Sequence, residues 1–407
     1  MGFHSLVRRV AGGDALDLEE WFLFQEARRL ANHRPAPPGL AGLLRRLVGR
    51  YGLDRLPQFL ACLRVDHPLV RPPLPDLSKG PPPFLYDLHC HTRWSDGGAT
   101  PKEVLRRVAA WGHLDGLAIT DHPWTRRLRG VDRRAPNEKV VRNSFRAARE
   151  ANALVAAGKL PEHFATFPGS AEFASRLDAD HPSTGVELVG LGLPENFVRE
   201  AGGLRRLRRL NALELVDAIH DAGGLVVLPH PFYFTSAGYS KGLVGAVDAF
   251  ELLNHTTGVW ADPATHPLHR RLLSGETLRR LSALFSYFNW RTCLLAASLG
   301  SACPALVGSS DAHVASLAGA AASAVPEPLD GLEGLRAALK RRRTAPCLNP
   351  RWEAVADADR VLGEAWDRWG GELAQLLGRL AGERPVASRL AGLASLLVKR
   401  TRLPPSC

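Results

Sequence analysis

The central part of this sequence predicts an α/β fold with a functional site at one edge of a parallel sheet. From Phe84 to about Leu348, short β-rich runs alternate with helical stretches, as in successive βα units. Several of the β-rich runs end in His, Asp or Glu. In parallel α/β folds, active sites form at the carboxyl ends of the strands, so this is where we expect the chemistry to lie.

The segments that flank this part predict a different organisation. Residues 1–70 have the apolar spacing of helices, and residues 71–83 contain six prolines, which favour a stiff linker. After Pro350 the helical spacing returns. We therefore expect an N-terminal helical region (1–70), a linker (71–83), a main domain (84–348) and a C-terminal helical extension (349–407).

One βα unit is predicted in detail by its local signals. Leu85–His91 has the pattern of a short strand. Thr100 and Glu103 have the spacing of a capping box around a proline at the first helical position, and Gly112 is placed to end the helix. The next strand is expected at Leu117–Ile119, so the unit predicts two parallel strands.

Composition narrows the class of protein. The 407 residues are 45% hydrophobic, and no run is apolar and uncharged for long enough to span a bilayer. The six cysteines are scattered without a CxxC pair, which is typical of isolated thiols, and acidic residues follow Arg8 and Arg9 where a secretion signal needs an apolar run. We expect a cytoplasmic protein. The net charge of +11 favours anionic partners, although a generally Arg-rich composition explains it equally well.

The first strand carries a pair of histidines suited to a metal ion. In Asp87-Leu88-His89-Cys90-His91, the two imidazoles stand two residues apart. Side chains alternate along a strand, so His89 and His91 are expected on one face and Cys90 on the other, where it packs. Two imidazoles on one face can hold one divalent ion, but an HxH pair also occurs by chance.

The other strand ends carry the same residue types. The segment Thr166–Glu172 is expected to be a strand that Glu172 closes, and Leu225–Leu228 a strand that leads to His230. A barrel or a curved sheet would bring these ends to one place. Metal-binding residue types at or near the strand ends are Asp96, Asp121, His122, Glu172, His230, Glu251, Asp311 and His313.

The ordered set of motifs resembles the PHP (polymerase and histidinol phosphatase) superfamily. The motifs are DLHCHT with SDG, then ITDH, a strand-end Glu, HP after a strand, and SDAH, and they extend over roughly Leu85–Leu348. The resemblance implies a distorted (β/α)7 TIM-like barrel, here with N- and C-terminal helical extensions. It also implies a centre of two or three divalent metal ions, usually zinc, manganese or iron.

The resemblance also implies which residues would bind the metals. One metal would be held by His89, His91, Glu172 and Asp311, a second by Glu172 and His230, and a third by Asp96, His122 and His313. The chain departs from the family at one ligand of the second metal, where relatives have a histidine and this sequence has Glu187. Glu187 takes that role, or His181 replaces it, or the second metal is weakly bound.

The chemistry expected of such a centre is hydrolysis of a phosphoester. Closely spaced divalent cations lower the pKa of a bound water and neutralise phosphate oxygens. Asp96 or His313 would help to protonate the leaving group. Arg126 and Arg127, which follow His122 closely, would bind a substrate phosphate, or else belong to a solvated basic loop.

These observations predict a phosphoesterase that acts on a small phosphorylated metabolite or a nucleotide. Two alternatives stay open: an exonuclease that acts on oligonucleotide ends, which the basic charge favours, and a degenerate PHP module that only mediates interactions. A metal-dependent amidohydrolase is a further alternative, at the level of the fold.

Overall fold

The computed structural model describes most of the central part of the chain. The described residues are 83–126, 134–177, 185–231, 240–255 and 299–356, with Thr292, Ala296, Arg360 and Glu364. The helical region predicted for residues 1–70, the linker up to residue 82 and most of the predicted C-terminal extension after residue 356 lie outside them.

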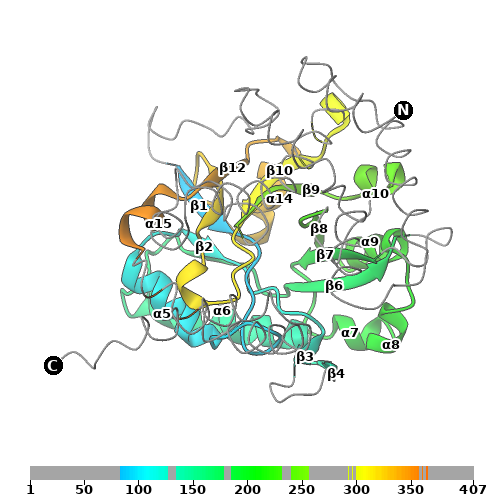
Figure 1. The fold of residues 1–407 in the computed structure, drawn as a ribbon, viewed down its shortest axis with the longest axis horizontal. Helices are drawn as coiled ribbons and strands as arrows, with labels where there is room; N and C mark the ends of the chain where they lie inside the picture. The colour runs from blue at the N-terminus through cyan, green and yellow to red at the C-terminus, as the bar shows by residue number, and fades with distance from the viewer. Residues whose placement is uncertain are drawn as a thin grey trace, which may run out of the picture.

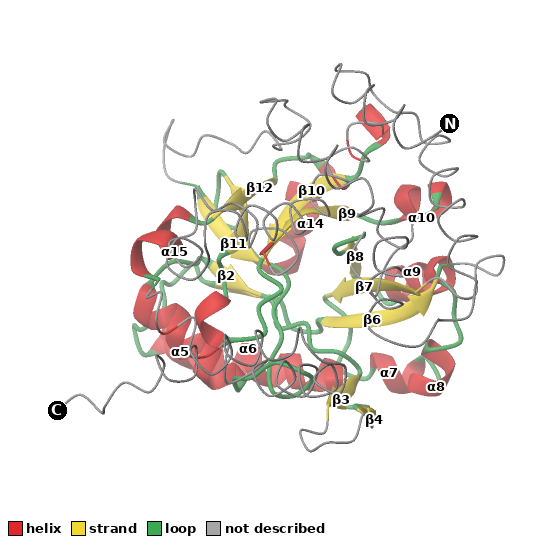
Figure 2. Cartoon of the chain, in the orientation of Figure 1, coloured by secondary structure: helices red, strands yellow, loops and turns green. Residues whose placement is uncertain are grey.

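A first sheet of five strands is built around β1 (Phe84–Asp87) (Figures 1 and 2). Strand β1 pairs parallel to β2 and antiparallel to β11, so the sheet is mixed. The order is β12 (Ala345–Leu348), β11 (Ala321–Val325), β1, β2 (Gly116–Leu117) and β5 (Ala165–Thr166).

A second sheet of five strands lies beside the first and is also mixed (Figure 2). Strands β8, β9 and β10 run parallel, whereas β7 is antiparallel to both of its neighbours. The order is β10 (Ala305–Ser309), β9 (Ala249–Asn254), β8 (Leu225–Leu228), β7 (Gly185–Leu191) and β6 (Ala171–Arg176). A separate hairpin pairs β3 (Trp124–Arg126) with β4 (Arg134–Pro136).

The expected closed (β/α)7 barrel is not present in the part of the chain that the structure describes. Instead, the two sheets meet where β10 approaches β11. The backbone N–H of Gly308 donates to the hydroxyl of Ser323, which in turn donates to the carbonyl of Gly308. A Cβ atom at Gly308 would lie 2.6 Å from the carbonyl oxygen of Ala322, so only glycine allows this close approach.

The predicted βα unit is confirmed. Helix α5 (Pro101–Trp111) begins at a capping box formed by Thr100 and Glu103, and it ends at Gly112, which adopts φ +60°. Strands β1 and β2 on either side of it are parallel. Both strands are shorter than the sequence predicts, and β1 ends at Asp87, before the two histidines.

The prediction of a single strand over Thr166–Glu172 is wrong. Strand β5 stops at Thr166, and β6 starts at Ala171, so Glu172 lies near the beginning of a strand and not at its end. A turn at Pro168-Gly169 separates the two strands: Gly169 has φ +77°, and a Cβ atom there would lie 2.0 Å from the carbonyl oxygen of Leu193.

Helices cover the outside of both sheets (Figures 1 and 2). Helix α6 (Val140–Ala156) packs with α5, and α9 (Ala212–Asp221) packs on the second sheet through Leu215 and Ile219. No described helix is both long and apolar enough for a membrane span. The remaining elements are α7 (Phe197–Glu200), α8 (Leu204–Leu207), α10 (Lys241–Ala246), η3 (Gly300–Ala302), η4 (Ala315–Leu317), α14 (Gly331–Lys340) and α15 (Pro350–Val355).

Candidate metal centre

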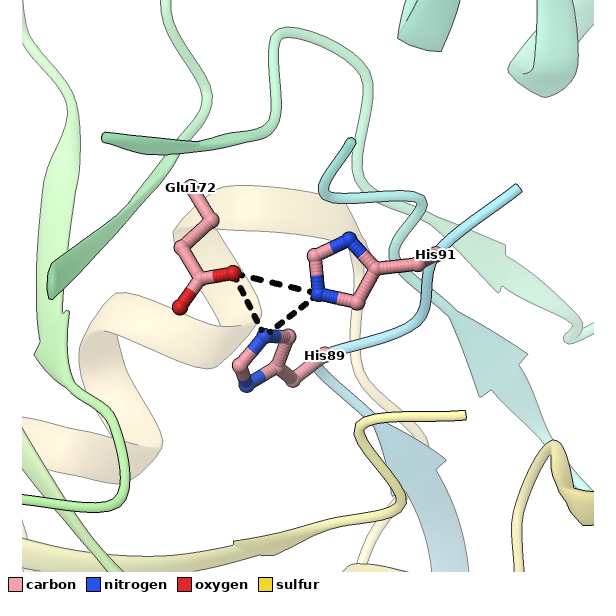
Figure 3. A group of neighbouring side chains, drawn as sticks. All are labelled: His89, His91 and Glu172. Atoms are coloured by element: carbon pink, nitrogen blue, oxygen red, sulfur yellow. Dashed lines mark hydrogen bonds and ion pairs between the residues drawn. The ribbon is translucent and has the colours of Figure 1, made fainter. Parts of the chain in front are cut away.

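His89 and His91 point at the same place, a carboxylate oxygen of Glu172 (Figure 3). Their Nε2 atoms are 3.0 Å apart and lie 3.3 and 3.1 Å from Oε2 of Glu172. All three side chains are buried. Cys90 packs on the other side of the segment, in the apolar cluster that includes Val104 and Val108, as the alternation of side chains predicts.

Asp311 brings a second carboxylate to the same point from the loop after β10. Its Oδ1 atom lies 3.6 Å from Nε2 of His89 and 3.3 Å from Nε2 of His91. The Asp311 backbone has φ +50°, a conformation that costs free energy for a non-glycine residue. Its N–H donates to the carbonyl of His89 over 2.8 Å, which holds this loop against the end of β1.

Asp96 gathers a second group of imidazoles on the solvent side of the centre. Its Oδ1 atom lies 3.4 Å from Nε2 of His313 and 3.8 Å from Nε2 of His122. His122 also approaches Glu172, with its Nδ1 atom 3.4 Å from Oε2. The side chains of Asp96 and His313 keep 11% and 15% of their surface exposed, compared with 1% for His89.

His230 and Glu187 form a third group around the other oxygen of Glu172. Nε2 of His230 lies 3.2 Å from Oε1 of Glu172. A ligand atom of Glu187 lies within 4.8 Å of ligand atoms of both residues, close enough for the three side chains to hold one ion. Of the two candidates for the missing family histidine, Glu187 reaches the centre, and His181 lies outside the described residues.

Glu251 positions two of these histidines, but its own carboxylate is not in one of the ligand groups. Its Oε1 atom accepts from Nδ1 of His89 over 3.3 Å, and its Oε2 atom accepts from the backbone N–H of His230 over 2.9 Å and from Asn254 over 2.8 Å. With Nδ1 of His89 donating to Glu251, a neutral His89 would carry its lone pair on Nε2, the atom that faces Glu172 and Asp311. His313 is arranged in the same way, since its Nδ1 atom donates to the carbonyl of Asp311 over 2.9 Å.

Asp121 was singled out in the sequence as a polar strand end, and the structure gives it a supporting contact. It accepts from the backbone N–H and the hydroxyl of Thr92, each over 2.7 Å, and from the hydroxyl of Ser95. These bonds hold the loop that carries Asp96.

Asp87 was missed by the sequence analysis. It accepts from the backbone N–H groups of Ser310 and Gly319, over 3.0 and 2.8 Å, and from the hydroxyl of Ser310. Burial raises the pKa of Asp87 to about 6, against these hydrogen bonds. The sequence signal that could have identified it is a carboxylate in an otherwise apolar strand, because a buried carboxylate needs hydrogen-bond donors.

The charges of the centre depend on one another. Burial raises the pKa of Glu172, but the nearby His89 and His122 outweigh this effect and hold it well below its usual value. Burial lowers the pKa of His91, yet hydrogen bonds to Asp311 and Glu172 raise it to about 10, and the bond to Glu172 likewise raises the pKa of His230 to about 9. Buried carboxylates thus require positive charge among them, and imidazole protons supply it here.

The same donor set suits divalent cations. Imidazole nitrogens and carboxylate oxygens are the ligands of zinc, manganese and iron in proteins, and here they converge in overlapping groups of three. A cation would replace the imidazole protons as the source of positive charge. The residues present therefore fit the metal centre that the family resemblance implies.

The two predicted arginines cannot be placed in this geometry. Arg126 is the last residue of β3, and Arg127 lies outside the described residues. Their contact with a substrate phosphate stays a prediction. His255, which follows the last strand residue Asn254, is buried, and its ring packs edge-on against Trp352 at 5.6 Å between centroids.

Comparisons with known proteins give distant similarities. No family model matches the chain. A 5'-3' exoribonuclease from Haemophilus influenzae is 26% identical over 198 residues, which cover 38% of this chain and 71% of that protein.

Solved structures with a similar arrangement include PHP-like proteins. A two-domain protein from Bacteroides vulgatus, described as containing a predicted PHP-like metal-dependent phosphoesterase, has 15% identity and a TM-score of 0.38 over 65% of each chain. That match spans less than two thirds of the other protein. A predicted metal-dependent phosphoesterase from Bifidobacterium adolescentis has 16% identity and a TM-score of 0.30, over 57% of this chain and 89% of the other. An amidohydrolase from Chromobacterium violaceum has 18% identity and a TM-score of 0.27, over 43% and 78%.

PHP-like metal-dependent phosphoesterases are thus among the solved structures that the chain resembles. At these identities and TM-scores the alignments carry no argument about its activity, which has to be argued from its own residues.

Proposed function

We propose that this chain is a metal-dependent phosphoesterase of the PHP superfamily that hydrolyses a phosphomonoester. One observation carries the proposal: the ligand atoms of His89, His91 and Glu172 come within 3.3 Å of one another in a buried site, and further His, Asp and Glu side chains surround them. We infer that the two sheets correspond to the two halves of the distorted barrel of this family.

The proposed roles follow the grouping of the side chains. Divalent zinc, manganese or iron ions, two or three in number, would be bound by His89, His91, Asp96, His122, Glu172, Glu187, His230, Asp311 and His313. When bound, such ions neutralise phosphate oxygens and make a water molecule acidic enough to act near neutral pH. Glu251 positions His89 and His230, and Asp121 positions the loop of Asp96.

Asp96 and His313 are the candidates for proton transfer to the leaving group. They keep more exposed surface than the buried histidines of the centre, so they lie on the side from which a substrate arrives. The Nδ1 atom of His313 donates to a backbone carbonyl, so Nε2, which lies 3.4 Å from Oδ1 of Asp96, would exchange a proton with the substrate in a centre of two ions, in which the third position holds none.

The substrate class is a small phosphorylated metabolite or a nucleotide. The net charge of +11 supports an anionic substrate. An exonuclease that acts on oligonucleotide ends is the second candidate, because the same charge would also attract a polyanion and because the Haemophilus relative carries that description. Arg126 and Arg127 remain the proposed phosphate contacts in either case.

The test measures metal content and phosphate release together. Purified protein is analysed for bound metal and assayed on phosphomonoesters, nucleotides and 5'-phosphorylated oligonucleotides with added Mn²⁺ or Zn²⁺. We expect bound metal and phosphate release for the wild type, and the loss of both in His89→Ala/His91→Ala. The control is His220→Ala, which removes an imidazole on α9. That imidazole pairs with Asp248, which is not a proposed ligand. The exonuclease candidate would instead release mononucleotides from the oligonucleotides. A wild type that binds no metal and releases neither phosphate nor mononucleotides from any substrate would leave the non-catalytic alternative.

A further inference from the structure

The metal centre offers three positions that differ in their donor atoms. The first position has two imidazoles and two carboxylates, the second has one imidazole and two carboxylates, and the third has two imidazoles and one carboxylate. These sets are His89, His91, Glu172 and Asp311 for the first, Glu172, Glu187 and His230 for the second, and Asp96, His122 and His313 for the third.

We propose that the second position has the lowest preference for Zn²⁺ over Mn²⁺ of the three, so that it takes Mn²⁺ when Mn²⁺ is the more abundant ion, whereas the first and third positions take Zn²⁺. The centre would then be heterometallic. This inference rests on the proposed function, because it requires that the cluster binds metal ions. It goes beyond that function by assigning different ions to different side chains.

The register of the second sheet explains why two carboxylates meet at the second position. Strands β6 and β7 are antiparallel, with Glu172 opposite Val189 and Ala174 opposite Glu187. Glu187 and Val189 are two residues apart, so Glu172 and Glu187 project from the same face as diagonal neighbours. Val189 belongs to the apolar cluster between the sheets, which identifies this face as the inner one.

His230 completes the second position from the end of β8. Its Nε2 atom is 3.2 Å from Oε1 of Glu172, whereas Oε2 of the same carboxylate faces His89 and His91. Glu172 therefore offers one oxygen to each of two positions. Glu187 and His230 share the second position with Glu172, and Oδ2 of Asp311 lies 3.9 Å from Nε2 of His230, so any further donor from Asp311 would also be a carboxylate oxygen.

The donor chemistry then separates the ions. Carboxylate oxygens suit Mn²⁺, and imidazole nitrogens suit Zn²⁺, so the preference for Zn²⁺ is smallest where oxygen donors outnumber nitrogen donors. The second position is the one of the three with more carboxylates than imidazoles. At the first position, Glu251 fixes the tautomer of His89 with Nε2 directed inward, which favours Zn²⁺ there.

The experiment locates the ions directly. Metal-free full-length protein is incubated with Zn²⁺ and a large excess of Mn²⁺, and its metal content and Mn²⁺ EPR spectrum are recorded. Crystals of the loaded protein are measured at the Mn and Zn absorption edges to assign each position. We expect Mn²⁺ between Glu172, Glu187 and His230, and Zn²⁺ at the other positions.

Two variants of one residue provide the decisive comparison. Glu187→His adds a nitrogen donor and removes a charge. We expect the ratio of bound Mn²⁺ to Zn²⁺ at the second position to fall about tenfold, because an imidazole nitrogen replaces a carboxylate oxygen there. Glu187→Gln keeps an oxygen donor, so Mn²⁺ should bind more weakly there without a switch to Zn²⁺. Glu333→His makes the same replacement on an exposed helix position and should leave the ratio unchanged.

The possible failures are distinguishable. If no ion binds at any position, both this inference and the proposed function are overturned. If ions bind but Zn²⁺ occupies the second position of the wild type, or if Glu187→His leaves the ratio unchanged, only the inference is overturned. Circular dichroism of each variant confirms that a changed ratio does not come from unfolding.

Discussion

At the scale of single residues, side chains that are not proposed metal ligands hold the ligands of the centre in position. Glu251 is buried and holds His89 through one oxygen and His230 through the other. Asn254 donates both to Glu251 and to Asp311, over 2.8 and 3.3 Å, so one amide connects two carboxylates. A metal ligand depends on such contacts for its tautomer and its orientation.

Glu251→Gln should weaken the centre while leaving every proposed ligand in place. The amide presents one oxygen instead of two, so His89 and the N–H of His230 can no longer both be satisfied. We expect metal affinity to fall about 10- to 100-fold, measured by isothermal titration with Mn²⁺ or Zn²⁺. Glu327→Gln makes the same change at an exposed position and serves as the control. Unchanged affinity in Glu251→Gln would show that Glu251 does not position these histidines.

At the scale of elements, the fold depends on a seam between the two sheets. Strands β9 and β10 change register between Val307 and Gly308, and at this irregularity Gly308 bonds to Ser323 in β11. The loop after β10 carries Asp311 and His313, so the seam also places two proposed ligands. The bonds from Ser310 and Gly319 to Asp87 hold the far end of the same segment.

Gly308→Ala should separate the sheets locally. The added methyl group would lie 2.6 Å from the carbonyl oxygen of Ala322, and overpacking of this kind costs about 1–3 kcal/mol. Urea denaturation should show that loss of unfolding free energy, together with weaker metal binding. Gly245→Ala is the matched control, since a Cβ atom there meets no atom within 4 Å. Equal stability of the two variants would contradict a close-packed seam.

At the scale of the whole molecule, one buried histidine outside the centre joins distant parts of the chain. His113 follows α5, its Nε2 atom donates to the carbonyl of Ala318 over 2.7 Å, and its own carbonyl accepts from Asn349 over 2.9 Å. Burial lowers the pKa of His113 to about 4. The imidazole is therefore neutral in the folded protein at neutral pH.

The contribution of His113 to the free energy of unfolding should fall as the pH drops from 6.5 towards 4. In the unfolded chain His113 takes up a proton near pH 6.5, whereas in the folded chain it does so only near pH 4, so protonation favours unfolding between these values. The depressed pKa corresponds to roughly 3 kcal/mol that is present above pH 6.5 and lost at low pH. His113→Gln keeps a donor for Ala318 but does not titrate. Urea titrations from pH 7 to 4 should show a smaller loss for this variant, and parallel losses would contradict the assignment.

Signals between near neighbours in the chain determined much of the local structure. The capping box of Thr100 and Glu103 set the start of α5, Gly112 set its end, and the alternation of a strand separated His89 and His91 from Cys90. The strand Leu225–Leu228 was predicted to the residue. These features depend on contacts within a few residues, which is why a single sequence reveals them.

Contacts between distant segments decided the rest. The turn at Gly169, which moved Glu172 from the end of a strand to the start of the next, depends on its packing against Leu193. The arrangement in two mixed sheets depends on which strands pair, and the positioning role of Glu251 depends on His89, 162 residues away in the sequence. The sequence by itself thus predicted the His, Asp and Glu side chains that the structure brings together. Only the tertiary structure decided how they are grouped, because the spacing of residues in the sequence does not give the distance between side chains on separate strands.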